Sequence, residues 1–403
     1  MKSKTRIDVN KTPVADSHCH IFLPIQKRLN MSDLCRMYYM GQLRDLEVAR
    51  ELECKFIKTP VPFVSRLILE LGKLYREEEW AMSHLPKEAE SILEERYERV
   101  QNYSEYIKFL YDDISLQSMV VDLGYPEPPQ PTTGEIPILE RFKKEVNGSP
   151  PHIVHLFRIE TLTDELLEKK ETFSAFLSHW DAGIEEALKN PNNRGFKSVI
   201  AYRTGLDVRP WSRDEAGRNY EAYQRDPAAN IKPLMDFLCL RAMERTIEFN
   251  KVFQVHSGMG DLDIIAEKAH PLCIIELFKK PPFSELKFVL VHAGHPWVME
   301  AAQMCALLPN VYMDVSMGVP FYSFGMDLRL LEALEAAPID KILYGSDGFL
   351  LPEIHWIAGK LFKESLQSVF DQLIEKKQIT QSQAQDSAEK ILYKNATQLY
   401  TID

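Results

Sequence analysis

The sequence lacks several features that would place it in a particular class of protein. None of its six cysteines stands in a CxxC pair, and several lie among apolar residues, so we expect reduced thiols in a cytoplasmic protein. No apolar run approaches the length that crosses a bilayer, and the first residues hold no apolar segment typical of a signal peptide. No internal repeat is visible.

Basic residues are scarce relative to acidic ones. Lys and Arg number 48 against 59 Asp and Glu, which leaves a formal net charge of −11. Because nucleic acids and anionic membranes require a basic face on the protein, this balance argues against both as partners. We therefore expect a small-molecule substrate, and the sequence leaves open whether the chain forms a homo-oligomer.

The composition otherwise allows a large core. Hydrophobic residues make up 45% of the 403 residues, which is enough for a core without disulfide bonds. A chain of this length often divides into several domains, but α/β barrels run long as one domain. We expect a single domain over residues 1–403.

Short apolar runs of β-prone residues alternate with helical patterns. Eight runs are expected to form strands: Pro13–His20, Ser118–Leu123, His152–Ile159, Phe196–Arg203, Val252–His256, Lys287–His292, Val311–Val315 and Lys341–Tyr344. Continuous apolar runs are typical of strands buried on both faces of a parallel sheet. Their alternation with helices predicts an α/β fold, a (β/α)₈ TIM barrel. An open doubly wound sheet would fit the alternation equally well, but it would not explain where the polar residues fall.

Two regions depart from this alternation. Between the first two runs, Ser32–Cys54, Val64–Trp80 and Lys87–Tyr111 carry apolar residues at helical spacing. We expect a helical insertion at about 30–115 after the first strand, either as a lid or pocket wall or as a packing or oligomer contact. The second region, Gly124–Pro151, contains seven prolines and little periodicity, which predicts an irregular loop.

Polar side chains cluster at the carboxyl ends of the expected strands. His18 and His20 end the first run, and alternate residues of a strand point the same way, so both can chelate one ion at the barrel mouth. His256 and His292 end the fifth and sixth runs, and Asp347 follows the eighth. Neutral imidazoles with a carboxylate suit zinc, and also manganese, iron or cobalt, and leave room for a metal-activated water. Asp347 and His292 are candidates for transferring protons.

Several segments resemble a known superfamily of enzymes. ADSHCHIF, VHAGHP and LYGSDGF resemble the amidohydrolase superfamily, in its amidohydrolase-related branch. FKSVIAYRTGL, HSGMGD and YKNATQLY are similar to the nodulin-type amidohydrolase domain that is associated with glutamine synthetase. The resemblance implies an acid/base role for His292 and metal ligation by His18, His20, His256 and Asp347.

The resemblance also raises the question of a second ion. Many members of the superfamily bind two ions bridged by a carboxylated lysine at the end of strand four. Lys197 is the only lysine of the fourth run, and it lies near the start of that run. We therefore expect Lys197 at the bottom of the barrel and favour one ion over two.

Other polar residues near the strand ends are candidates for contacting substrate or ligands. The guanidinium of Arg203 can bind a carboxylate through two hydrogen bonds, or pair with a structural Asp. Asp314 is expected to support a ligand histidine. The further candidates for lining the pocket are Tyr202, His295, Glu353 and His355.

The pattern favours hydrolysis of a C–N amide-type bond in a small carboxylate-bearing substrate, for which a glutamyl amide is a first guess by analogy. The alternative is non-oxidative decarboxylation, which the amidohydrolase-related branch includes with the same ligand set. The two reactions differ in product, a free acid and amine against carbon dioxide. A catalytically silent scaffold is disfavoured because the complete set of candidate ligands is present.

Overall fold

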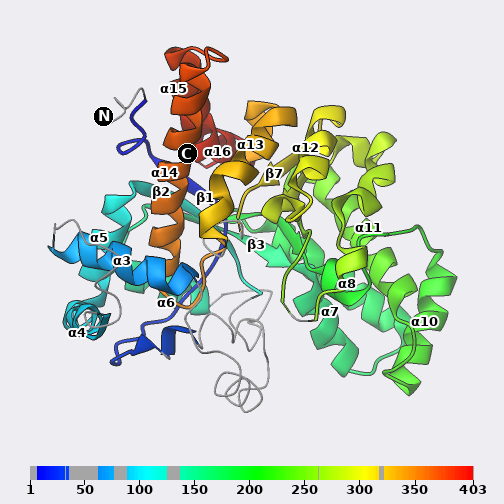
Figure 1. The fold of residues 1–403 in the computed structure, drawn as a ribbon. Helices are drawn as coiled ribbons and strands as arrows, with labels where there is room; N and C mark the ends of the chain where they lie inside the picture. The colour runs from blue at the N-terminus through cyan, green and yellow to red at the C-terminus, as the bar shows by residue number, and fades with distance from the viewer. Residues whose placement is uncertain are drawn as a thin grey trace.

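Eight parallel strands form the centre of the molecule. The computed structural model describes residues 7–31, 33–35, 62–76, 89–124, 137–261, 263–316 and 322–402. Neighbouring strands pair in chain order from β1 to β8. Figure 1 labels β1, β2, β3 and β7 among them. The strands are β1 (Val14–His20), β2 (Leu116–Asp122), β3 (His152–Arg158), β4 (Asn193–Ser198), β5 (Val252–His256), β6 (Lys287–Val291), β7 (Val311–Asp314) and β8 (Ile342–Leu343).

The sheet closes on itself through the short last strand and the loop that follows it. Backbone hydrogen bonds join the Ser17 N–H to the Tyr344 carbonyl at 2.9 Å and the Asp347 N–H to the His18 carbonyl at 2.9 Å. A third bond runs from the His20 N–H to the Gly348 carbonyl at 2.8 Å. The result is a nearly closed barrel, which confirms the predicted (β/α)₈ fold.

Helices cover the outside of this barrel (Figure 1). The α-helices after β2 are α6 (Pro137–Val146), α7 (Ile159–Glu168), α8 (Phe173–Lys189), α9 (Ile200–Arg203), α10 (Arg213–Arg225), α11 (Lys232–Glu248), α12 (Val298–Leu307), α13 (Met326–Ala336), α14 (Pro352–Glu375), α15 (Gln381–Glu389) and α16 (Asn395–Tyr400). Local sequence sets their starts. Thr172 caps α8 by accepting the Ala175 N–H, and Ser212 forms a capping box with Glu215 at α10.

The core has an inner and an outer part, which the strands separate. On β2, Val120 belongs to the inner cluster, whereas Met119 and Val121 belong to the larger outer one. This follows from the alternation of side chains along a strand. The inner cluster consists of Ala15, Val120, Val154, Leu156, Val252, Val289 and Leu343, with Ala396, Leu399 and Tyr400 from α16. Because apolar residues fill the barrel, the polar residues beyond them lie at its mouth.

Between β1 and β2 the described residues include α3 (Pro62–Arg76), α4 (Ala89–Arg99) and α5 (Tyr103–Asp113), and residues 31 and 33–35 are helical too. Residues 36–61 and 77–88, which include most of the expected helix Ser32–Cys54, lie outside the described residues. The insertion at about 30–115 as one unit therefore stays a prediction. The described part is joined to α14 by the fully buried ion pair of Arg96 with Glu353.

Two local expectations were wrong. The fourth strand was expected at Phe196–Arg203, but β4 ends at Ser198 and the segment Ile200–Arg203 is a short helix. The region Gly124–Pro151 was expected to be irregular, but residues 137–146 form α6, a strongly amphipathic helix, and only its proline-dense start, residues 125–136, lies outside the described residues. The prolines concentrated before and after this helix obscured its own periodicity.

Candidate metal centre

Every strand contributes a polar side chain at its carboxyl end. On β2 and β3 the last inward-facing residue is polar and lies two positions beyond a residue of the inner cluster, Asp122 after Val120 and Arg158 after Leu156. On β4 the polar residue is Lys197, one position before the strand ends. On the other strands the polar residue ends the strand or follows it. Together they form a polar ring, which we define as His18, His20, Asp122, Arg158, Lys197, His256, His292, Asp314 and Asp347.

The carboxylate of Asp347 lies at the centre of the histidines. Its Oδ1 is 3.4 Å from Nε2 of His18 and 3.4 Å from Nε2 of His20. Its Oδ2 is 4.0 Å from Nδ1 of His292. The ring of His256 packs edge-on against that of His292, with centroids 4.6 Å apart. The structure thus brings together all five residues that the sequence predicted as ligands or proton-transferring groups.

Hydrogen bonds behind two of the imidazoles select their tautomers. Nδ1 of His20 lies 3.3 Å from the carbonyl of Asp122, which can only accept, so Nδ1 carries the proton. Nδ1 of His292 lies 2.8 Å from Oγ of Ser316, whose hydroxyl donates to Asp314. His292 therefore donates from Nδ1 as well. In both rings Nε2 keeps its lone pair, which a cation or a proton can use.

Burial keeps the imidazoles neutral. Burial lowers the pKa of His18, His256 and His292, and the nearby Lys197 ammonium lowers these pKa values further. Burial alone would raise the pKa of Asp347, but its histidine neighbours outweigh that effect and hold its pKa well below the usual range. Neutral imidazoles and an ionised carboxylate are the protonation states that a divalent cation requires.

The donor atoms of the ring fit a divalent cation. Ligand atoms of His18, His292 and Asp347 all lie within 4.8 Å of one another. Nε2 of His256 is buried and has no hydrogen-bond partner within the described residues, although a buried ring nitrogen normally has one. A cation among these atoms would supply the missing partner. This group includes His292, so His292 is a further candidate ligand, whereas ligation by His18, His20, His256 and Asp347 together stays a prediction.

Lys197 lies at the mouth, not at the bottom of the barrel as expected. Because β4 ends at Ser198, Lys197 is the last inward-facing residue of the strand. Its Nζ is 3.4 Å from Nε2 of His18. Burial lowers the pKa of Lys197 to about 8, so its amine is more easily deprotonated than that of a surface lysine. The argument that favoured one ion over two is therefore wrong.

The predicted substrate-binding residues differ in the contacts that they make. Nη2 of Arg203 donates to Asp164 at 2.7 Å, so this guanidinium is used by an ion pair at the rim. The ring of Tyr202 packs 4.5 Å from that of His256, and its hydroxyl accepts the Asp261 N–H. His295 lies farther out, where its Nδ1 accepts a hydrogen bond from Nε of Arg329 at 3.2 Å.

Sequence reasoning missed one ion pair of the ring and misplaced two other residues. Asp122 is completely buried and accepts hydrogen bonds from Nη2 of Arg158 and from its Nε, whose N–H is shared between the two carboxylate oxygens at 3.2 Å. The guanidinium holds the pKa of this carboxyl below its usual range although burial opposes the effect. Alternation along β2 and β3 could have revealed both residues. Glu353 and His355 were expected to line the pocket, but both are buried on α14, where Glu353 pairs with Arg96 and His355 lies beside Asp16 of β1.

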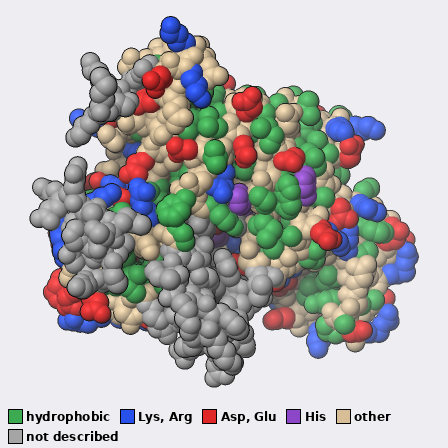
Figure 2. Space-filling model, viewed as in Figure 1, with side chains coloured by type: hydrophobic (Ala, Val, Ile, Leu, Met, Phe, Trp, Pro, Cys, Tyr) green, Lys and Arg blue, Asp and Glu red, His purple; other side chains and the backbone are tan. Residues whose placement is uncertain are grey.

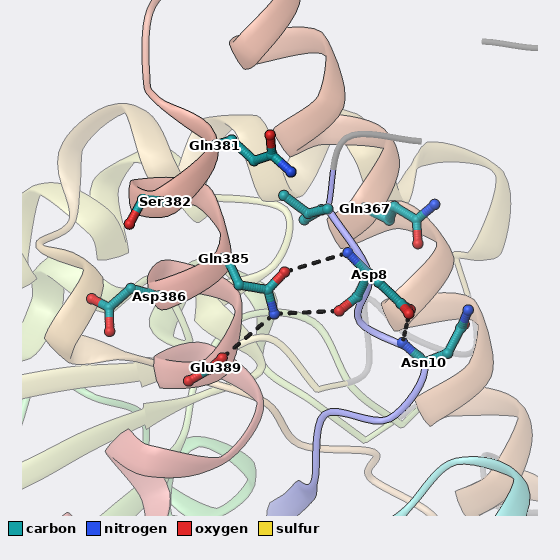
Figure 3. A pocket seen from close by; sticks show the side chains of 9 residues that line it. Asp8, Asn10, Gln367, Gln381, Ser382, Gln385, Asp386 and Glu389 are labelled. Atoms are coloured by element: carbon teal, nitrogen blue, oxygen red, sulfur yellow. Dashed lines mark hydrogen bonds between the residues drawn. The ribbon is translucent and has the colours of Figure 1, made fainter. Parts of the chain in front are cut away.

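The cavities of the molecule differ in character. One cavity, of about 1090 Å³, lies away from the mouth beside the segment that precedes β1, among polar residues of α14 and α15 such as Gln367 and Gln385 (Figure 3). A smaller cavity is lined by His292, His295 and Arg329 and by apolar side chains. Figure 2 shows histidine side chains at the surface near the middle of the view, among hydrophobic and basic neighbours.

Comparisons with known proteins agree with this architecture. A family model described as Amidohydrolase matches residues 177–402. Protein fluG of Emericella nidulans is 31% identical over 265 residues, which are 62% of this chain and 30% of that protein. The chain therefore spans less than a third of the length of this relative. Among the described residues, no helix combines the length and the apolar character that a membrane span requires.

Two solved structures share the fold over nearly the whole chain. A Lactobacillus casei protein described as a metal-dependent hydrolase has a TM-score of 0.79 and 23% identity, with 98% of this chain and 96% of that one covered. The uronate isomerase of Thermotoga maritima has a TM-score of 0.66 and 15% identity, with 97% and 95% covered. Because the matching family model covers more than half of its residues, the chain belongs to the amidohydrolase family.

Proposed function

We propose that the chain is a metal-dependent hydrolase that cleaves a C–N amide-type bond of a small carboxylate-bearing substrate, with a glutamyl amide as the first candidate. The observation that carries this proposal is the position of Asp347, whose carboxylate lies 3.4 Å from Nε2 of both His18 and His20. One carboxylate can then hold a cation and accept a proton from water at the same place. Zinc suits the donor set best, and the number of ions stays open.

Two residues of the chain, Asp347 and His292, would carry out the proton transfers. A bound cation would supply Lewis acidity, which polarises a carbonyl and lowers the pKa of a water. Asp347 Oδ2 would accept the proton of the attacking water, because its Oδ1 faces His18 and His20. Nε2 of His292 carries no proton of its own, so it would take up from Asp347 the proton of the attacking water and pass it to the leaving amine, while the contact of Nδ1 with Ser316 fixes the ring.

The substrate carboxylate must be bound by a residue other than Arg203, which the sequence predicted for this role. Arg203 is paired with Asp164, whereas Arg329 has no carboxylate within ion-pair distance among the described residues. Burial and the Arg329 guanidinium lower the pKa of His295 to about 4, so this imidazole stays neutral, accepts from Arg329 at Nδ1 and donates from Nε2. We propose that Arg329 and His295 together bind the carboxylate of the substrate.

The test is a reaction screen on reconstituted protein. Protein stripped with a chelator is reloaded with Zn²⁺, Mn²⁺, Co²⁺ or Fe²⁺ and incubated with γ-glutamyl amides and other acyl amides. Release of amine in the loaded protein supports the proposal, whereas release of carbon dioxide from aromatic or other carboxylic acids would support the decarboxylase instead. Asp347→Asn should lower metal affinity by more than about tenfold and activity by roughly 10² or more. Asp340→Asn, on an exposed carboxylate that pairs with Lys390, is the matched control.

The carboxylate site has its own test. Arg329→Met should raise KM by about 10- to 100-fold with little change in kcat, because a charge-assisted hydrogen bond contributes roughly 1.5–3 kcal/mol. Arg203→Met should leave KM within about twofold of the value for the natural chain, because the guanidinium of Arg203 is already paired with Asp164. If Arg203→Met raised KM and Arg329→Met did not, Arg203 would be the residue that binds the substrate carboxylate.

A further inference from the structure

A second cluster of potential metal ligands lies behind the ring. Asp16 and Cys19 belong to β1, and His355 belongs to the first turn of α14. Ligand atoms of the three side chains all lie within 4.8 Å of one another. Each residue is at most 1% exposed. Carboxylate, thiolate and imidazole are the three kinds of protein ligand that zinc prefers.

The imidazole of this cluster lacks hydrogen-bond partners. Neither ring nitrogen of His355 has one in the described residues, and Nδ1 lies 3.9 Å from Oδ2 of Asp16, beyond hydrogen-bond range. The hydroxyls of Tyr111 and Tyr344 are buried too, with no partner in the part of the chain that the structure describes, and the Tyr111 ring lies 6.3 Å from that of His355. Each such atom costs about 1–3 kcal/mol. A group bound among these side chains would remove that cost.

The charge of the cluster favours a cation over water. Asp16 accepts hydrogen bonds from the His18 N–H at 3.3 Å and from the Ser346 N–H at 2.9 Å, and also from the Ser346 hydroxyl. No Lys or Arg of the described residues lies within ion-pair distance of it. Water would satisfy the hydrogen bonds but would leave a buried charge uncompensated.

We propose that Asp16, Cys19 and His355 bind a divalent cation, with zinc as the best match to the three donors. The thiol of Cys19 releases its proton to solvent on binding, as a coordinating thiol does. In a tetrahedral site, ligand atoms lie about 3.4 Å apart, so atoms that now lie within 4.8 Å of one another must approach by at most about 1.4 Å. A water or the hydroxyl of Tyr111 or Tyr344 completes the coordination.

This site would be structural. It would connect β1, which carries His18 and His20, to α14, which begins five residues after Asp347. Its sulfur ligand distinguishes it from the ring at the mouth, which holds only nitrogen and oxygen donors. The two sites can therefore be examined separately in one protein.

Cobalt substitution tests the proposal on the intact chain. Metal-free protein is titrated with Co²⁺, and a thiolate-to-cobalt charge-transfer band in the near ultraviolet reports the sulfur site. Visible ligand-field bands report cobalt bound to nitrogen and oxygen donors. We expect both in the natural chain. His355→Gln should remove the charge-transfer band although every thiol is still present, and Cys19→Ser should do the same. Cys305→Ser, a buried free cysteine of α12, is the control and should keep the band.

The metal analysis and the cobalt spectra can each support or overturn the proposed site. Metal analysis after zinc loading should show one ion fewer per chain in His355→Gln than in Cys305→Ser. The absence of a charge-transfer band in the natural chain at saturating Co²⁺ would overturn the proposal and leave ordered water as the occupant. A band that survives in His355→Gln would overturn it as well, since the sulfur would then belong to another cysteine. Loss of the ligand-field bands alone would count against the ring at the mouth and not against this site.

Discussion

The acid sensitivity of the fold can be predicted from one histidine far from the metal centre. His155 lies in β3, is 3% exposed, and its Nδ1 has no hydrogen-bond partner in the described residues. Burial, together with the charges of Lys143, Lys251 and Arg194, lowers the pKa of His155 from 6.5 to about 4. The imidazole is therefore neutral in the folded protein over most of the acidic range.

The sign of the effect follows from proton linkage. Below pH 6.5 the unfolded chain binds a proton at His155, but the folded chain does not until about pH 4. Stability is thus fully present above pH 6.5 and is lost as the pH falls through this window. At about 1.4 kcal/mol for each pH unit, the loss reaches about 3 kcal/mol at pH 4, of which about 2 kcal/mol is lost by pH 5.

Urea unfolding of the natural chain and of His155→Gln measures this loss. Glutamine does not titrate, so the difference in free energy of unfolding between the two proteins should change by about 2 kcal/mol between pH 7 and pH 5, at the expense of the natural chain. Both proteins are kept in chelator so that the histidines at the mouth contribute equally and cancel. Parallel pH profiles for the two proteins would refute the reasoning.

Three further substitutions test other parts of the structure. Arg96→Met should lower the free energy of unfolding by about 3–5 kcal/mol, because it leaves the buried carboxylate of Glu353 unpaired, and adding Glu353→Gln should recover part of the loss in the same urea assay. Gly258→Ala should lower both the melting temperature and metal content, since Gly258 has φ +83° and a Cβ there would lie 2.2 Å from the His295 carbonyl; an unchanged protein would contradict this. Thr172→Ala should cost about 1 kcal/mol by removing the cap of α8, and no change in the unfolding midpoint would show that the cap is dispensable.

The sequence predicted the barrel and the histidines well because both depend on local pattern. The fifth strand, Val252–His256, was predicted to the residue, since apolar β-prone residues fill it and a polar residue ends it. The positions of His18 and His20 followed from their alternation on one strand. Such signals are contained within a few neighbouring residues.

The fourth strand could not be placed in the same way. Its first half, beginning at Asn193, has little β-propensity, and it is a strand because it pairs with β3 and β5. Gly195 shows the constraint, because a Cβ there would lie 1.8 Å from the Val252 carbonyl of the neighbouring strand. That contact is a tertiary one. The error moved the expected position of Lys197 from the mouth to the bottom and changed the argument about the number of ions.

The sequence also could not show which neighbour in space each polar side chain contacts. The sequence left Arg203 free to bind a substrate or to pair with an acid, and only the fold shows that Asp164 lies 2.7 Å away. The support of His292 by Ser316 likewise joins residues 24 positions apart. Residue type identifies what a side chain is able to do, whereas its neighbours in space determine which of these roles is open to it.

The way in which the barrel closes has a consequence for biosynthesis. His18 and His20 leave the ribosome early, but Asp347 and the backbone groups that pair with them are made more than 300 residues later. A nascent chain therefore cannot assemble the complete ring until its last strand has emerged. Only chains that contain the last strand and Asp347 would then bind the cation. A product that stops before Gly345 should neither retain metal nor close the barrel between β1 and β8. Metal retention would therefore show that synthesis has passed this point.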